Sequence, residues 1–183
     1  MSIRDRWINF LYRAAKGTRK TRMLLTPVGF ILFGVFTGLF VALAMLTDRW
    51  LSLAWPLPGG PSWFIAVLLL IVGTGVMAWS ALHFLKVKGT PVPFNPPPEL
   101  VTTGPYRFSR NPMLTGVFIL LFGIGFAVRS LSLVVLFTPL YILANVSELK
   151  AIEEPELVKR LGEAYIAYRR RTPMFIPGMR PRK

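Results

Sequence analysis

The chain has 183 residues, of which 53% are hydrophobic and 16% charged, and its mean hydropathy is +0.51. This composition excludes an ordinary soluble domain and indicates one domain, residues 1–183, that crosses a membrane several times. The absence of cysteine excludes a disulfide framework, a thiolate zinc site and a cysteine nucleophile. The net charge of +14 comes from Lys and Arg residues outside the long apolar runs, which favours contact with anionic lipids over nucleic-acid binding.

The first residues, 3–16, are predicted to form an amphipathic helix. Ile3, Trp7 and Phe10 recur at helical spacing with basic residues between them. This pattern is typical of a helix that lies flat on a membrane surface. A basic, polar segment follows, so residues 1–22 form an amphipathic N-terminal part of the domain.

Two uncharged runs, residues 24–46 and 63–85, are each long enough to cross a bilayer. Both contain 23 residues, and at about 1.5 Å of rise per residue such a helix measures roughly 35 Å. We therefore expect residues 24–85 to supply the first two membrane spans.

Small residues in these spans predict close helix packing. Gly34, Gly38 and Ala42 are four residues apart, and such a stripe usually lets another helix approach. The second span contains Gly73-Thr74-Gly75, for which two interpretations stay open: close packing, or an approach of the backbone to a cofactor.

A proline-rich segment, residues 86–111, precedes the third apolar run. Its six prolines predict a stiff, extended loop, and a loop this long in a compact domain is usually functional. Asn111 and Pro112 make a good helix start, because the Asn side chain can cap free N–H groups and proline tolerates the first helical position. With Arg107 and Arg110 beside it, this positive helix end predicts a seat for an anionic or zwitterionic small molecule.

Residues 112–128 and 131–146 are apolar runs of 17 and 16 residues, which predicts a short helical hairpin in which Pro139 kinks the second helix. With the two full spans, the hairpin gives four transmembrane segments. Twenty of the 22 Lys and Arg residues lie before residue 24, between residues 86 and 111, or after residue 147. This distribution predicts that both termini and the long loop are cytoplasmic.

From residue 148 the chain is expected to leave the membrane as an amphipathic cytoplasmic helix that Pro155 interrupts. Five of the eight acidic residues lie in this helix. Because proline removes a backbone donor, it should free a carbonyl next to Glu153 and Glu154. The two carboxylates belong either to a solvated charged face or to a binding site. With a single histidine, His83, a metal site has little support, and the basic, proline-broken tail after residue 168 is expected to lie along a lipid surface.

Two blocks of this sequence together resemble a known family. They are Gly104-Pro105-Tyr106-Arg107 with Arg110-Asn111-Pro112-Met113, and Glu153-Glu154-Pro155 with Leu157, Gly162, Tyr165 and Tyr168 at matching spacing. They look like the signature blocks of the integral-membrane methyltransferases, the family of isoprenylcysteine carboxyl methyltransferases and phospholipid N-methyltransferases with its bacterial members. The resemblance covers residues 73–177.

The resemblance implies an all-α polytopic membrane protein that uses S-adenosylmethionine and methylates an isoprenoid- or phospholipid-like substrate entering from the bilayer. The bacterial-type match also implies the inner membrane, with residues 86–183 as the catalytic core. From the chemistry of methyl transfer, Glu154 and Arg107 are the candidate catalytic residues, Glu154 as a base and Arg107 as a partner for an anionic group. The residues that would contact the cofactor are Leu100, Val101, Tyr106, Arg110, Asn111, Pro112, Met113, Leu114 and Glu153.

Three positions depart from the family pattern. Asn111 stands where the prenylcysteine enzymes usually have histidine, Leu114 replaces a frequent tyrosine, and Leu149 stands where those enzymes have an arginine. These departures argue against a prenylcysteine substrate. Two other functions stay open: a non-catalytic membrane scaffold that retains the family core, and an enzyme similar to the membrane sterol reductases, which use a nicotinamide cofactor.

Overall fold

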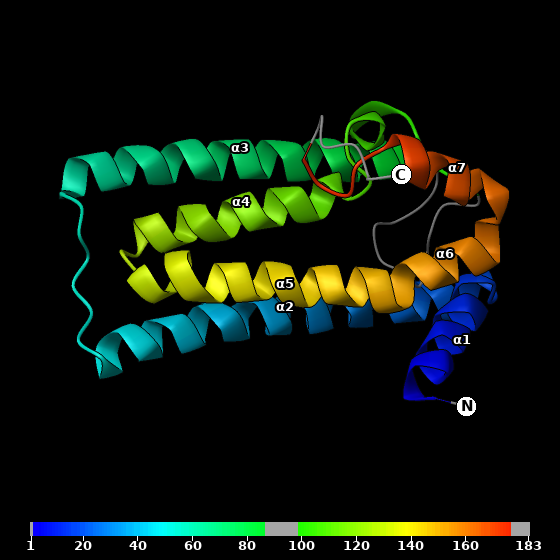
Figure 1. Ribbon diagram of the computed structural model, residues 1–183, viewed down its shortest axis with the longest axis horizontal. Helices are drawn as coiled ribbons and strands as arrows, with labels where there is room; N and C mark the ends of the chain where they lie inside the picture. The colour runs from blue at the N-terminus through cyan, green and yellow to red at the C-terminus, as the bar shows by residue number, and fades with distance from the viewer. Residues whose placement is uncertain (1, 87–98, 177–183) are drawn as a thin grey trace. The chain divides into compact units, whose positions relative to one another are not determined.

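All regular secondary structure in the described part of the protein is helical, which confirms the all-α prediction. The computed structural model describes residues 2–86 and 99–176, so the proline run at 91–98 lies outside the described residues. The elements in chain order are α1 (Ile3–Ala15), α2 (Arg19–Trp50), α3 (Gly59–Lys86), the 3-10 turn η1 (Gly104–Arg107), α4 (Pro112–Ala127), the π-turn η2 (Leu133–Phe137), α5 (Thr138–Glu148), the π-turn η3 (Leu149–Glu153), α6 (Glu154–Leu161) and α7 (Glu163–Arg171) (Figure 1).

Among residues 2–86 and 99–176, three helical stretches are long and apolar enough to cross a membrane, namely Lys20–Trp50, Gly59–Phe84 and Leu133–Leu161, and Pro112–Ala127 is a shorter apolar helix. The described part of the protein therefore contains three to four helices that are long and apolar enough to span a membrane, against the four predicted from the sequence. The last stretch is longer than expected, because it continues past residue 148 through η3 into α6. Each π-turn ends two residues before a proline, Pro139 or Pro155, where the sequence predicts that the helix is disturbed.

The chain divides into two compact units. The first contains Met1–Leu32, Trp79–Pro112 and Val146–Lys183, and the second contains Phe33–Ala78 and Met113–Asn145. Both signature blocks lie in the first unit up to Pro112, and α4 continues from there into the second.

In the second unit, α3 and α4 approach each other at a pair of glycines. A Cβ on Gly73 would lie 2.9 Å from the carbonyl oxygen of Gly116, and one on Gly116 would lie 2.8 Å from the carbonyl oxygen of Gly73. Gly73 therefore serves helix packing. The stripe on α2 makes no such approach within the second unit, because nothing lies within 4 Å of a Cβ built on Gly34 or Gly38, and a contact with another molecule stays a prediction. A small residue permits close approach but does not choose the partner helix.

Polar groups inside the second unit hold its helices together. The Asp48 carboxylate, near the end of α2, accepts hydrogen bonds from the Ser130 hydroxyl and from the Ser132 N–H at 2.9 Å, just before η2. Farther along, the fully buried Tyr141 has its hydroxyl 2.8 Å from that of Thr37. These bonds fix α2 against the second arm of the hairpin.

In the first unit, α1 is a helix as predicted. A capping box starts it, in which the Ser2 side chain accepts from the Asp5 N–H and the Asp5 side chain accepts from the Ser2 N–H. Leu11 is buried, whereas Ile3 and Trp7 are exposed. The helix packs on η3 and α6 (Figure 1).

Candidate functional site

The first signature block forms a tight turn against the end of α3. Gly104 begins η1 with φ +58, and a Cβ there would lie 2.6 Å from His83 Nδ1, so both conformation and space require glycine. The Nε2 atom of His83 lies 2.9 Å from the hydroxyl of Thr103. The single histidine of the chain thus holds this turn in place.

Tyr106, the centre of that turn, is buried and connects the two signature blocks. Its ring meets Phe84 edge-on with centroids 4.8 Å apart, and its carbonyl accepts a hydrogen bond of 2.7 Å from the hydroxyl of Tyr168. Burial, Tyr168 and the Glu153 carboxylate raise the pKa of Tyr106.

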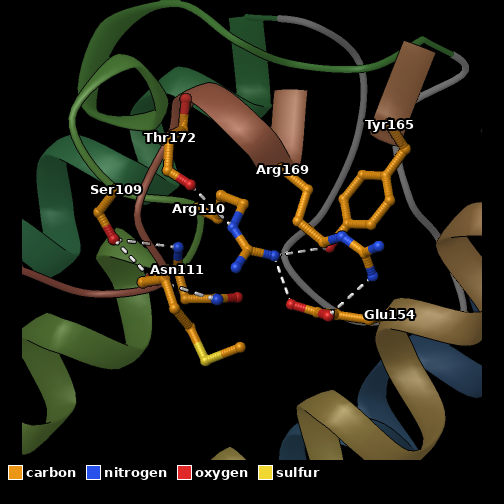
Figure 2. A network of polar contacts seen from close by, with 8 residues as sticks. Ser109, Arg110, Asn111, Glu154, Tyr165, Arg169 and Thr172 are labelled. Carbon is orange, nitrogen blue, oxygen red and sulfur yellow. Dashed lines mark hydrogen bonds and ion pairs between the residues drawn. The ribbon is translucent and has the colours of Figure 1, made fainter. Parts of the chain in front are cut away.

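Arg110 lies at the centre of a buried polar network (Figure 2). Its side chain is 8% exposed and forms an ion pair with Glu154. The same guanidinium donates to the Tyr165 hydroxyl at 3.2 Å and to the Thr172 carbonyl at 3.0 Å. Its second terminal nitrogen, Nη2, makes no hydrogen bond to another described residue. One direction of the guanidinium is therefore available to a ligand.

Glu154 binds a second arginine, which leaves the cluster positive. Its other carboxylate oxygen lies 3.3 Å from Arg169 Nη1 (Figure 2). Two arginines on one carboxylate give a net charge of +1. Burial and the Glu154 carboxylate raise the pKa of Tyr165 to about 12 despite the opposing effect of Arg110, so its hydroxyl stays neutral at physiological pH.

Glu153 differs from the two glutamates that follow it. Glu156 pairs with Arg160 at 2.9 Å, and Glu154 pairs with its two arginines. The half-buried Glu153 makes no hydrogen bond or ion pair with any residue that the structure describes. Its carboxylate is therefore free to bind a cationic or hydroxyl-bearing ligand.

The C-terminal tail folds back onto the loop before α4, a contact that the sequence does not predict. The N–H of Arg110 donates to the Pro173 carbonyl at 2.9 Å. The Met174 carbonyl accepts from the N–H of Asn111 at 3.2 Å and from the hydroxyl of Ser109 at 2.9 Å. The tail thus fixes the backbone that leads into α4 (Figure 2).

The remaining predicted residues differ in their position and burial. Helix α4 begins at Pro112, as predicted, and the amide nitrogen of the Asn111 side chain lies 3.4 Å from the Met174 carbonyl. Leu100 and Val101 are half-buried in the irregular segment before η1. Met113 and Leu114, also half-buried, occupy the first turn of α4 in the other unit, and Arg107 is exposed.

Five residues of the network were not predicted as site residues: Ser109, Tyr165, Arg169, Thr172 and Met174. Tyr165 belongs to the second signature block, so its place there is a signal that sequence offers. Arg169 reads as one of three consecutive basic residues, and no local pattern distinguishes the one that reaches Glu154.

Comparison with known proteins bears on this arrangement. A model of the phospholipid methyltransferase family matches residues 62–164, which include Tyr106, Arg110 and both Glu153 and Glu154. The chain belongs to the phospholipid methyltransferase family. The resemblance inferred from the two blocks is confirmed, and the match includes η1 and the segment from η3 to α6.

One curated protein is also similar to this chain. The nickel-cobalt-cadmium resistance protein NccN of Alcaligenes xylosoxydans xylosoxydans is 32% identical over 122 residues, which are 63% of this chain and 53% of the relative. The chain thus matches about half the length of that relative. No solved structure matches the chain significantly. Within residues 2–86 and 99–176, no three His, Cys, Asp or Glu side chains form a group that could hold a metal ion.

Proposed function

We propose that this family member is an S-adenosylmethionine-dependent methyltransferase that acts on a lipophilic, isoprenoid- or phospholipid-like substrate at the cytoplasmic membrane face. Family membership and the apolar helices support methyl transfer within a membrane. The observation that carries the cofactor assignment is the Glu153 carboxylate, which has no partner among the described residues, in the same unit as Tyr106 and a net positive arginine cluster.

The residues present fit this cofactor, which has a carboxylate, an amino group and a sulfonium. Arg110, with its free Nη2 atom, and the start of α4 at Asn111 suit the carboxylate. The Glu153 carboxylate suits the amino group or the ribose hydroxyls. Tyr106, Leu100, Val101 and Pro112, which are half-buried or buried in the first unit, are proposed to supply apolar contacts. For Met113 and Leu114 the proposal rests on the family resemblance alone.

Methyl transfer then requires little from the protein beyond positioning of the reactants. S-adenosylmethionine, when bound, would supply a methyl group on a sulfonium: a nucleophile would bond to the methyl carbon as the carbon–sulfur bond breaks, and S-adenosylhomocysteine would leave as a neutral thioether. Because such a displacement needs little proton transfer, the main task of the side chains is to orient the reactants and to exclude water. Arg110 and Glu153 bind groups of opposite charge and so fix orientation. Glu154 holds Arg110 in place and is the candidate base for a protonated amine substrate.

The membrane supplies the substrate in this proposal. The exposed Arg107 guanidinium makes no ion pair in the described part of the chain and suits an anionic lipid headgroup. The Lys and Arg distribution supports a location of the loop and both termini on the cytoplasmic side of the inner membrane.

Isothermal titration of the detergent-solubilised protein with S-adenosylmethionine and S-adenosylhomocysteine tests the cofactor assignment. We expect binding by the wild type and about tenfold weaker binding by Glu153→Ala and by Asn111→Ala, since each removes a hydrogen bond to a charged ligand group. Glu163→Gln is the matched control, because Glu163 is exposed and unpaired in the described structure.

Three results separate the alternatives. Absence of binding by the folded wild type contradicts the proposal and favours the scaffold. Binding of a nicotinamide cofactor instead favours a sterol-reductase-like enzyme. Unchanged affinity in both Glu153→Ala and Asn111→Ala contradicts the placement of the site.

A further inference from the structure

Helix α1 contacts the segment that carries Glu153, and it lies outside the region shared with the family. The family match begins at residue 62, whereas α1 is Ile3–Ala15. In the first unit α1 packs on both η3 and α6. Any effect of α1 on the binding site therefore comes from a part of the chain that the family model does not match.

The contact nearest to Glu153 uses a carbonyl that proline leaves free. Pro155 has no N–H, so it cannot donate to the carbonyl four residues earlier, that of Ala151. Arg4 Nε donates to that carbonyl at 2.8 Å. The Arg4 side chain thus supplies the hydrogen-bond donor that the backbone of Pro155 lacks. The carbonyl that accepts this bond lies two residues before Glu153.

Other contacts fix the position of Arg4 relative to that carbonyl. The capping box of Ser2 and Asp5 starts α1 immediately before Arg4 and uses both side chains in the cap. Lys159, on α6, donates to the Asn9 side chain at 2.6 Å. The Lys159 ammonium also lies 4.6 Å from the centre of the Tyr12 ring. Helix α1 therefore forms hydrogen bonds on both sides of Pro155, with Ala151 in η3 and with Lys159 in α6.

The position of Glu153 depends on backbone geometry more than that of its neighbours does. Glu154 and Glu156 are held by arginines, but the Glu153 side chain has no partner among the described residues. It is the last residue of the π-turn η3, a backbone form whose hydrogen bonds are longer-range and rarer than those of an α-helix. Support for this turn is therefore support for the Glu153 carboxylate.

We propose that Arg4 is a positioning residue that orients Glu153 for ligand binding through the Ala151 carbonyl. This proposal rests on the proposed function, in which Glu153 binds S-adenosylmethionine. Arg4 contacts neither ligand nor reacting atoms. It limits the freedom of η3, so the carboxylate needs less ordering when the ligand binds.

The test is a double-mutant cycle on the full chain in detergent, with S-adenosylhomocysteine as titrant. We expect Arg4→Ala to raise the Kd about fivefold, the range of one hydrogen bond, and Arg4→Lys to restore part of the affinity. Arg6→Ala, which removes an exposed arginine on the same helix without a described side-chain partner, should leave the Kd unchanged. In a Glu153→Ala background, Arg4→Ala should have no further effect, whereas a general structural role would lower affinity equally in both backgrounds and overturn the proposal.

Hydrogen exchange of the ligand-free protein separates this proposal from the proposed function. We expect amides of residues 149–156 to exchange faster in Arg4→Ala than in Arg6→Ala. Equal exchange in the two variants overturns the role of Arg4, whatever the protein binds. If the wild type does not bind S-adenosylhomocysteine but exchange differs, the ligand assignment fails and the support of η3 by Arg4 stands.

Discussion

The ion pair between Arg110 and Glu154 leads to a sharp prediction for Glu154→Gln. The two side chains are only 8% and 13% exposed, so the substitution leaves a buried arginine without its neutralising carboxylate. Removal of one partner of a buried ion pair typically destabilises a protein by about 3–5 kcal/mol. Arg110 keeps its hydrogen bonds to the Tyr165 hydroxyl and the Thr172 carbonyl, and glutamine keeps one acceptor oxygen, so we expect about 2–3 kcal/mol here.

Thermal unfolding in detergent measures this loss. For a protein of this size, about 1 kcal/mol corresponds to roughly 2–4 °C, so the expected fall in Tm is roughly 4–12 °C. Glu163→Gln, at an exposed and unpaired glutamate, should lower stability by less than about 1 kcal/mol. Replacement of both Arg110 and Glu154 by methionine should be less destabilising than the sum of the single Met substitutions. Equal Tm shifts for Glu154→Gln and Glu163→Gln would refute the reasoning.

Two further predictions concern packing and pH. Gly116→Ala should lower stability by about 1–3 kcal/mol in the same thermal assay, because its Cβ would lie 2.8 and 2.9 Å from two backbone atoms of α3. Gly75→Ala is the control and should be neutral or slightly stabilising, because nothing lies within 4 Å of its Cβ. Similar Tm values for the two variants would show that α3 and α4 do not meet at Gly116. Since burial raises the pKa of Tyr165 to about 12, the unfolded chain loses this proton first as pH rises, so stability is full below pH about 10 and falls between pH 10 and 12. Tyr165→Phe should weaken that alkaline loss in chemical unfolding measured at pH 9 and pH 11.5, and an unchanged slope would argue against a buried Tyr165.

Local patterns predicted the helices, and they predicted a helix boundary where a proline marks it, because caps and prolines act on neighbouring residues. The start of α4 at Pro112 follows from proline at a first helical position. The free carbonyl before Pro155 also follows from sequence, but its partner, Arg4, is 147 residues away. The packing of α1 on η3 brings Arg4 to this carbonyl, and no pattern within one helix predicts that packing.

Contacts between segments far apart in the sequence account for the features that the sequence did not predict. Gly34 and Gly38 have the spacing of a packing stripe, yet the close helix approach is at Gly73 and Gly116. Both pairs permit contact, and only the arrangement of the helices selects one. The tail after α7 is basic and interrupted by Pro173, which predicts an extended segment but not that it bonds to the loop before α4.

The same limit applies within the candidate site. Sequence identifies Glu153 and Glu154 as adjacent carboxylates but does not show which one is neutralised. The answer comes from Arg110 and Arg169, which lie 44 and 15 residues from Glu154. Only the folded first unit shows that Glu153 is the unpaired member.

Transfer of a labelled methyl group tests the central claim most directly. Membranes from cells that express the chain would be incubated with S-adenosylmethionine carrying a radioactive methyl group, and label would be measured in the lipid extract. The account predicts label in the extract well above that of membranes expressing Glu153→Ala at equal protein level. Equal label in the two extracts, with both proteins folded, would contradict a lipid-directed methyltransferase that uses Glu153.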